Sequence, residues 1–288
     1  MALNCKLALS TNSKKINEEL FRSFSTAGIE ATEISVSSNE YENLDFCNIL
    51  RLSKKYNIKL WSFHLPFSPF NIIDISNPDV AQHTVDLFKT YIKKANDIGI
   101  KIFVLHPSGE PIKDADRKNR MQCAKKSLKE LAEYANGLNC VIAVENLPRS
   151  CLGNNSKEIL ELISVHNNLC VCCDTNHLLN EDIVDFIHNV GNRIVTVHIS
   201  DCDFINERHW LPGEGKIDWS SVVKAFGDIG YDKYWLYEVE YAPPWSIERD
   251  RNLNCTDFKN NFTELVQGKE LTKIGRPKNN LEMWNIAL

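Results

Sequence analysis

Short apolar runs alternate with helical segments along almost the whole chain, and this alternation constrains the fold more than any other feature. A run of β-branched and other apolar residues predicts a buried strand, and apolar residues at three- to four-residue spacing predict a helix. Strict alternation implies parallel strands with right-handed crossovers, and eight such units close a barrel. Eight strands are predicted, at Cys5–Ser10, Ala31–Val36, Lys59–Leu65, Lys101–His106, Cys140–Glu145, Leu169–Asp174, Arg193–His198 and Tyr234–Glu238.

Helical patterns fill the intervals. They are predicted at Lys14–Ala27, Glu40–Tyr56, Pro78–Ile98, Asp114–Asn136, Lys157–His166, Ile183–Val190, Trp219–Ile229 and Cys255–Gln267. We therefore expect an α/β fold with a single (β/α)8 TIM barrel over residues 1–268, and a C-terminal extension, residues 269–288, that packs on the barrel. The alternative is an open doubly wound sheet, which should carry a glycine-rich phosphate turn after its first strand. The sequence there is S-T-N-S-K-K, which is not such a turn.

Composition narrows the class of protein. Hydrophobic residues make up 43% of the chain and charged residues 25%, as in soluble globular proteins. No window has the roughly 18 consecutive apolar residues of a membrane helix, and the amino terminus lacks a secretion signal, so we expect no membrane partner and a cytoplasmic location. The ten cysteines are scattered and several fall in predicted strands, which favours reduced core thiols. A net charge of -5 argues against a nucleic-acid partner.

The predicted strands from the third onward end on or next to an ionisable residue. These residues are His64, His106, Glu145, Asp174, His198 and Glu238. The carboxyl ends of barrel strands line one rim, so topology alone brings these metal-binding side chains together. Glu145 and Asp174 directly follow buried apolar runs, where an unpaired charge is costly and a cation compensates it. We therefore expect one divalent metal ion, Mn²⁺, Mg²⁺, Co²⁺ or Zn²⁺, since this donor set does not choose among them.

Loop residues beyond these strand ends extend the candidate set. They are His177, Asp201, Glu207 and His209. A lone histidine or carboxylate at a strand end is more often a hydrogen-bonded rim residue than a metal ligand. A metal site is favoured here because six such residues stand at equivalent positions of successive strands. The alternative interpretation of His177 is a helix-capping or packing residue, and the alternative interpretation of Arg208 is a solvated loop charge. Four aromatic residues are candidates either for the pocket walls or for ordinary packing: Trp61, Phe67, Trp210 and Trp245.

Six motifs carry a resemblance to a known family. They are H-L-P-F at His64, V-L-H-P-S-G-E-P at His106, V-E-N-L-P-R at Glu145, D-T-N-H at Asp174, V-H-I-S-D at His198 and H-W-L-P-G-E-G-K-I-D-W from His209. Together they resemble the xylose isomerase-like TIM-barrel superfamily over nearly the whole chain. Within that superfamily the chain is most similar to the sugar-phosphate isomerases and epimerases.

This resemblance implies roles for individual residues. It implies one divalent metal held by Glu145, Asp174, His198 and Glu238. It also implies that Glu145 and Glu238 move protons, while His177 and Arg208 contact the substrate. Glu240, two residues beyond Glu238, would face the same side of the strand and is the rival for that role. We add His64, His106 and His209 to the predicted substrate-binding residues.

A related branch offers a second reading. Enzymes of the endonuclease IV type resemble the chain at His64, His106, Glu145, Asp174, His177, His198, His209 and Glu238. That resemblance implies three zinc ions and cleavage of a phosphodiester in abasic DNA. Glu207 stands where that branch has an aspartate, and no basic and aromatic loop run predicts a DNA clamp.

We therefore expect a metal-dependent sugar or sugar-phosphate isomerase or epimerase with a small carbohydrate as substrate. Glu145 and Glu238 transfer protons through an enediolate in this reading. The alternatives are the zinc phosphodiesterase and a non-catalytic, metal-stabilised barrel, since a fold does not by itself imply a function. A homodimer is compatible with the sequence, although no residue argues for one.

Overall fold

The computed structural model describes residues 4–12, 14–67 and 72–279. Within them, eight parallel strands form the barrel, in the order β7-β6-β5-β4-β3-β2-β1-β8. A parallel bridge between Ile199 and Tyr237 joins the two ends of this series. The strands are β1 (Lys6–Ser10), β2 (Ala31–Ile34), β3 (Lys59–His64), β4 (Ile102–Leu105), β5 (Val141–Glu145), β6 (Leu169–Asp174), β7 (Ile194–His198) and β8 (Tyr234–Tyr237).

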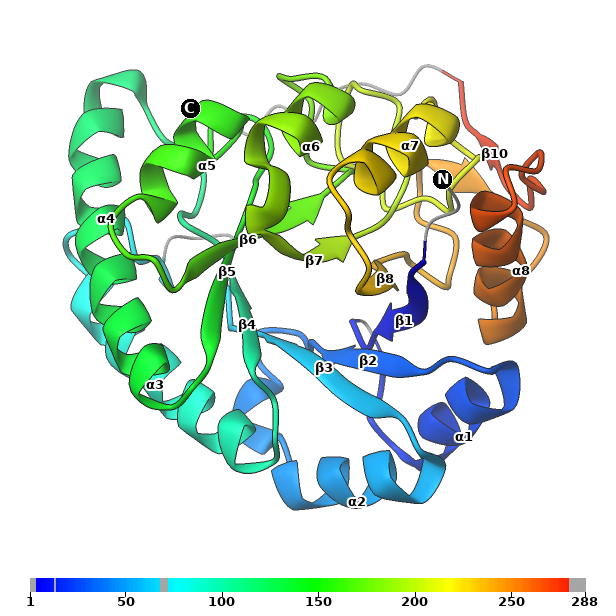
Figure 1. The fold of residues 1–288 in the computed structure, drawn as a ribbon, viewed down its shortest axis with the longest axis horizontal. Helices are drawn as coiled ribbons and strands as arrows, with labels where there is room; N and C mark the ends of the chain where they lie inside the picture. The colour runs from blue at the N-terminus through cyan, green and yellow to red at the C-terminus, as the bar shows by residue number, and fades with distance from the viewer. Residues whose placement is uncertain (1–3, 13, 68–71, 280–288) are drawn as a thin grey trace.

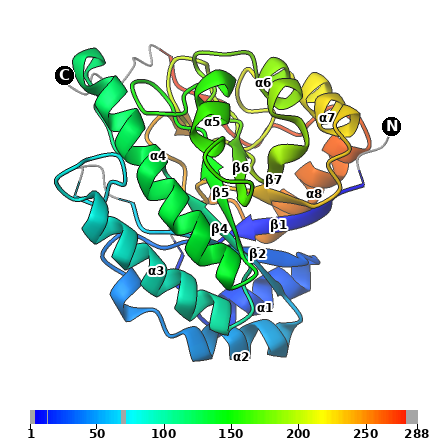
Figure 2. The same cartoon turned by 60° about the vertical axis from the view of Figure 1, so that its left-hand side comes forward.

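A ring of helices surrounds the strands, as Figures 1 and 2 show from two directions. The α-helices in the described residues are α1 (Glu18–Ala27), α2 (Phe46–Tyr56), α3 (Ala81–Asp97), α4 (Asp114–Gly137), α5 (Ser156–Ile163), α6 (Ile183–Val190), α7 (Trp219–Asp228) and α8 (Cys255–Val266). Two 3₁₀ turns, η1 (Tyr41–Asn43) and η2 (Gly191–Arg193), precede α2 and β7. The predicted TIM barrel is thus confirmed, with element ends that differ from the predicted ones by a few residues.

Local capping explains where the first helix begins and ends. The Asn17 side chain accepts a hydrogen bond from the Leu20 amide, which satisfies one of the free N–H groups of the first turn of α1. Gly28 ends the helix with φ +73°, a left-handed conformation that glycine adopts without steric cost. The chain then turns directly into β2.

Side chains inside the barrel lie in layers, because residues two apart on a strand face the same side. Towards the amino ends of the strands, Trp61 packs against interior side chains and its Nε1 donates to Thr196 Oγ1 at 3.1 Å. Its interior neighbours are small or apolar: Ala8, Ala31, Ile102, Val104, Ala143, Cys172 and Leu236. Two residues further along the strands, the sequence places a different class of side chain: Glu33, His106, Glu145, Asp174, His198 and Glu238.

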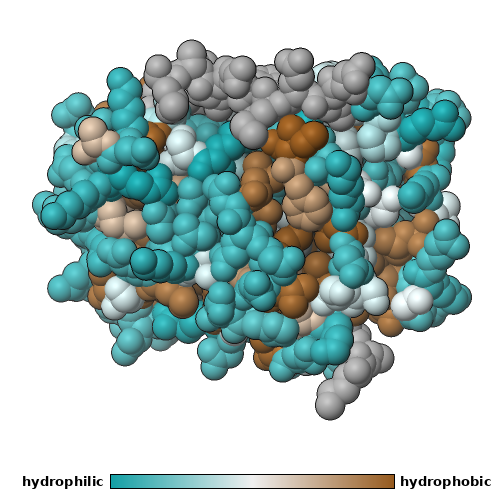
Figure 3. All heavy atoms as spheres, turned by 90° about the horizontal axis from the view of Figure 1, so that it is seen from above, coloured by the Kyte–Doolittle hydropathy of each residue, from teal (hydrophilic) through white to brown (hydrophobic). Residues whose placement is uncertain are grey.

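The segment after α8 returns to the barrel. β10 (Arg276–Pro277) pairs antiparallel with β9 (Ile247–Glu248), and Leu271 lies against Gly213. Residues 280–288, the rest of the predicted extension, lie outside the described residues. The face seen in Figure 3 is mostly hydrophilic, with a strip of hydrophobic residues near its middle. None of the helices that the structure describes is long and apolar enough to cross a membrane.

Candidate metal centre

Four of the predicted ligands meet at the carboxyl end of the barrel. Donor atoms of Glu145, Asp174, His198 and Glu238 all lie within 4.8 Å of one another, and all four residues are buried. Nδ1 of His198 lies 3.1 Å from Glu145 Oε1 and 3.2 Å from Glu238 Oε2. We call these residues the four-donor group.

One oxygen in this group has no hydrogen-bond partner. Oδ1 of Asp174 accepts from the Asn176 amide at 2.6 Å, whereas Oδ2 is buried and has no hydrogen-bond partner among the described residues, although His177 Nδ1 lies 3.4 Å from it. A buried carboxylate oxygen without a partner is costly, and a cation next to it removes that cost. This orphaned atom therefore fits a metal ligand.

The pKa shifts in the four-donor group indicate that positive charge stabilises it. Burial raises the pKa of the Asp174 carboxyl to about 6. Burial also opposes ionisation of Glu238, but His198 outweighs it and lowers the pKa of Glu238 to about 2. Burial alone would lower the pKa of His198, yet the acidic groups around it, Cys172, Glu33, Glu238 and Glu145, raise it well above its ordinary value. A divalent cation would supply the charge that a proton on His198 supplies here, and three carboxylates with one imidazole suit Mn²⁺, Mg²⁺, Co²⁺ or Zn²⁺.

Two further histidines lie on the other side of Glu145. Nε2 of His64 is 3.1 Å, and Nε2 of His106 is 3.4 Å, from Glu145 Oε2. The ring of Phe67 stacks on His106 with 4.5 Å between centroids. These histidines and Glu145 form a second donor group within the same distance limit, so Glu145 is shared between the two groups.

A third donor group consists of His177, Glu207 and His209. Nε2 of His177 lies 3.0 Å from Glu207 Oε2, and Glu207 Oε1 accepts from Arg149 at 2.7 Å. Burial alone would lower the pKa of His177, but Asp174 and Glu207 raise it to about 10. The Glu207 carboxylate is thus already paired with two cations of the chain. His209 Nδ1 lies 3.2 Å from the carbonyl oxygen of Glu238.

A cavity of about 450 Å³ opens over these groups. All five predicted substrate-binding residues line it: His64, His106, His177, Arg208 and His209. Glu145 and Glu238 also reach its surface, whereas Asp174 and His198 are not part of the lining. The four-donor group therefore has two members that face the cavity and two that lie beneath it.

Arg208 is held in place rather than solvated. It is 4% exposed, and its Nε donates to Asp203 Oδ2 at 2.9 Å. Its guanidinium carbon lies 5.9 Å from the ring centroid of Trp245, which also lines the cavity. The interpretation of Arg208 as a solvated loop charge is therefore wrong.

The aromatic wall candidates divide into two kinds. Phe67 and Trp245 line the cavity. Trp210 is fully buried and donates from Nε1 to Ser246 Oγ, and the partly buried Trp61 packs at the amino end of the barrel, so these two are packing residues.

Asp201 has a structural role in the loop after β7. Its carboxylate accepts from the amides of Gly213 and Ile217 and from Trp219 Nε1. These bonds connect the loop to the start of α7, and the donor groups found among the described residues do not include Asp201. Glu240 lines the cavity but is likewise outside the donor groups, whereas Glu238 is within one.

Two site residues escaped the sequence reasoning. Glu33 is fully buried on β2 with its carboxylate at His198, and Arg149 joins Glu207 to Glu110. Glu33 lies in the second predicted strand, Ala31–Val36, whereas the candidate set takes strand ends only from the third strand onward. Arg149 stands in the quoted motif V-E-N-L-P-R, where an arginine next to a predicted acidic site was a usable signal.

Comparison with known proteins gives relatives of two kinds. A probable endonuclease 4 of Mesoplasma florum is 28% identical over 233 residues, covering 71% of this chain and 74% of that protein. A D-psicose 3-epimerase of Ruminiclostridium cellulolyticum is 24% identical over 217 residues, covering 71% and 72%. An uncharacterized protein of Methanocaldococcus jannaschii is 26% identical over 237 residues, covering 78% and 77%.

Solved structures share the fold. A D-tagatose 3-epimerase-like protein superposes with a TM-score of 0.74 at 21% identity, covering 91% of this chain and 97% of that one. An L-ribulose 3-epimerase gives a TM-score of 0.68 at 20% identity, covering 82% and 81%. The profile of the xylose isomerase-like TIM barrel family matches residues 21–254. The chain, with its eight-stranded barrel and this match over most of its length, belongs to the xylose isomerase-like TIM barrel family.

Proposed function

We propose that the chain is a divalent-metal-dependent epimerase or isomerase of a small sugar. The observation that carries the proposal is the four-donor group, in which two carboxylates, Glu145 and Glu238, also face the cavity. The epimerases among the relatives and similar structures support it.

The two donors that line the cavity and the two that lie beneath it would have different roles. A divalent ion held by the four-donor group would polarise the carbonyl and hydroxyl oxygens of the substrate. Glu145 and Glu238, which both line the cavity, would hold the ion and also exchange protons with the substrate. One takes the proton from the carbon beside the carbonyl, and the other returns a proton, so that the reaction passes through an enediolate. Asp174 and His198, which are not part of the cavity lining, would serve only as ligands of the ion.

The cavity lining indicates how a sugar is held. Imidazoles of His64, His106, His177 and His209 can donate to or accept from hydroxyl groups, and the Phe67 and Trp245 rings offer apolar faces. The guanidinium groups at the cavity are already paired, Arg149 with Glu110 and Glu207, and Arg208 with Asp203. We therefore infer an unphosphorylated sugar, because the carboxylates of Glu110, Glu207 and Asp203 already compensate the charge of both guanidinium groups and leave less net positive charge for a phosphate.

One observation favours the phosphodiesterase as second candidate. Four candidate donor groups lie among the described residues, and three of them share Glu145: the four-donor group, the group with His64 and His106, and a further set with Cys172 and His198. A carboxylate shared in this way suits a centre of several metal ions. The group of His177, Glu207 and His209 counts against it, because Glu207 is paired with Arg149 and His177 and has no need of a metal ion for charge compensation.

Metal analysis and two assays separate these functions. The epimerase proposal predicts one tightly bound divalent ion per chain and incorporation of deuterium from D₂O into a ketose beside its carbonyl, followed by NMR over a panel of ketohexoses and ketopentoses. Three ions per chain with cleavage of an abasic oligonucleotide would establish the phosphodiesterase instead. A bound ion with neither activity over these panels would leave a metal-stabilised barrel and refute both.

A further inference from the structure

Glu33 is a buried acid for which the proposed reaction has no use. Its side chain is fully buried on β2, inside the barrel. Burying an unpaired carboxylate costs several kcal/mol, so such a group persists only where specific partners hold it. The partners of Glu33 are the Ser62 hydroxyl, which donates to Oε2 at 2.8 Å, the Ser10 hydroxyl at 3.4 Å from Oε1, and the imidazole of His198.

The two ring nitrogens of His198 face different groups. Nδ1 points into the four-donor group, at 3.1 Å from Glu145 Oε1 and 3.2 Å from Glu238 Oε2. Nε2 points to the Glu33 carboxylate, at 3.1 Å from Oε1 and 3.2 Å from Oε2. A carboxylate accepts hydrogen bonds only, so Glu33 favours a proton on Nε2. Glu145 and Glu238 favour a proton on Nδ1 in the same way, and a metal ion bound between them would replace that proton and bind the lone pair of Nδ1.

Glu33 itself lies outside both the donor groups and the cavity. None of the donor groups found among the described residues includes it, and it is not part of the cavity lining. It therefore contacts neither a substrate nor the position of the ion directly. The donor-group residue that its carboxylate contacts is His198.

We propose that Glu33 is a positioning residue that fixes the orientation and tautomer of His198, so that Nδ1 is presented to the metal ion. The inference rests on the metal site of the proposed function. It adds Glu33 to that site as a residue that contacts the His198 imidazole at the nitrogen facing away from the ion. A carboxylate behind a ligating histidine also makes the imidazole a stronger donor, and losing such a partner typically costs about 10–100-fold in metal affinity. Ser62 in turn fixes the carboxylate.

The test measures metal binding directly, apart from turnover. Metal-stripped full-length chain is titrated with Mn²⁺ by calorimetry as wild type, Glu33→Gln and Ser62→Ala. We expect Glu33→Gln to raise the Mn²⁺ Kd about 10–100-fold, because it removes the negative charge while nearly keeping the shape. Ser62→Ala should raise the Kd by a smaller factor, since the carboxylate remains but loses one of its supports.

Thr196→Val is the matched control. It removes a hydroxyl from the same interior face of β7, two residues before His198, and leaves the Trp61 Nε1 without its partner. This change should lower the thermal midpoint yet leave the Mn²⁺ Kd unchanged. In the Zn²⁺-loaded chain labelled with ¹⁵N-histidine, the shifts of His198 should show Nδ1 bound and Nε2 protonated in the wild type, and a changed Nε2–H resonance in Glu33→Gln.

The outcomes separate this inference from the proposed function. Equal Mn²⁺ affinity in folded Glu33→Gln and wild type, or equal weakening in Thr196→Val, would overturn the role of Glu33 while leaving the metal site intact. Weakened binding in Glu33→Gln alone supports the role even if no sugar is turned over, in which case only the proposed reaction fails. If Glu33→Gln does not fold, Ser62→Ala decides, and an unchanged Kd there overturns the role.

Discussion

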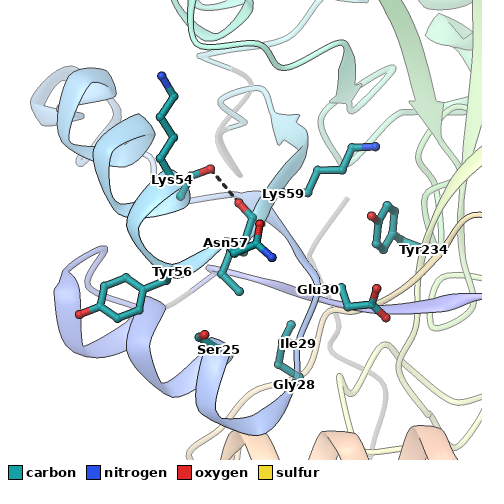
Figure 4. A pocket seen from close by; sticks show the side chains of 11 residues that line it. Ser25, Gly28, Ile29, Glu30, Lys54, Tyr56, Asn57, Lys59 and Tyr234 are labelled. Carbon is teal, nitrogen blue, oxygen red and sulfur yellow. Dashed lines mark hydrogen bonds between the residues drawn. The ribbon is translucent and has the colours of Figure 1, made fainter.

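The two ends of this barrel differ in how far their charged side chains are exposed to water. At the amino end, a groove of about 580 Å³ lies between the ends of α1 and α2 and the starts of β2, β3 and β8 (Figure 4). Glu30, Lys59 and Tyr234 line it, and the Lys6–Glu30 pair beside it is 62% and 45% exposed. At the carboxyl end the cavity is smaller, but Glu145, Glu238, His64 and His177 in its lining are buried.

The difference shows which property marks a functional site. Water screens the charges of the amino-end groove, so these pairs contribute little and need no other ligand. The buried carboxylates of the four-donor group cannot be solvated, so they require a proton or a metal ion. The size of a hollow is therefore a poor guide here, whereas buried, uncompensated charge is a good one.

The largest expected effect is on activity, and it should be seen at the carboxyl end of the barrel and not at the amino end. Glu145→Gln and Glu238→Gln should each lower the rate of deuterium incorporation into the accepted sugar by about 10²–10⁴-fold, the usual contribution of a proton-transferring group. Glu30→Gln, in the amino-end groove, is the control and should leave the rate unchanged. Full activity in both carboxyl-end variants would refute the assignment of the two glutamates.

Removing the metal ion from the carboxyl end should lower the stability of the folded chain. An ion held at a free concentration of 100 times its Kd stabilises the folded chain by about 2.7 kcal/mol, so chelation should lower the thermal midpoint measured by circular dichroism. Asp174→Asn should abolish most of this difference, because the variant loses the negative charge and the carboxylate oxygen that has no hydrogen bond. A chelator that changes the midpoint of both proteins equally would contradict this.

The pH dependence of the metal-free chain should reflect His177. Its pKa is raised to about 10 in the folded chain, against about 6.5 when unfolded. The folded state therefore binds the proton more tightly. This contribution to stability is complete below pH 6.5 and is lost as the pH rises towards 10. Between pH 7 and pH 9.5 the free energy of unfolding, measured by urea denaturation, should fall more in wild type than in His177→Gln. Equal falls in the two proteins would disprove that His177 causes this pH dependence.

The smallest effect is expected at the amino end. Lys6→Gln removes the exposed pair with Glu30, and we expect no measurable change in the urea midpoint, the metal affinity or the activity. A clear loss in any of them would show that the two ends are coupled.

Sequence reasoning found most of the fold and of the four-donor group for one physical reason. A buried apolar run that ends abruptly in a charge identifies both a strand and the rim where it emerges. β6 was predicted with its observed ends, Leu169–Asp174, and Glu145 and His198 were placed at the ends of β5 and β7. In these cases a local pattern determined the position of the side chain.

What escaped prediction depends on contacts between distant segments. Glu33 meets His198 across 165 positions of sequence, and Arg149 meets Glu207 across 58. Periodicity contains no information about such pairs. The burial of Trp210 and the pairing of Arg208 with Asp203 depend in the same way on how the loop after β7 folds back, which no run of residues predicts.

The most direct test of the central claim is a crystal structure of the Mn²⁺-loaded chain with anomalous scattering data. The account predicts a manganese peak coordinated by Glu145, Asp174, His198 and Glu238. An Mn²⁺-loaded crystal with no peak among these four residues, or with manganese only between His177, Glu207 and His209, would contradict it.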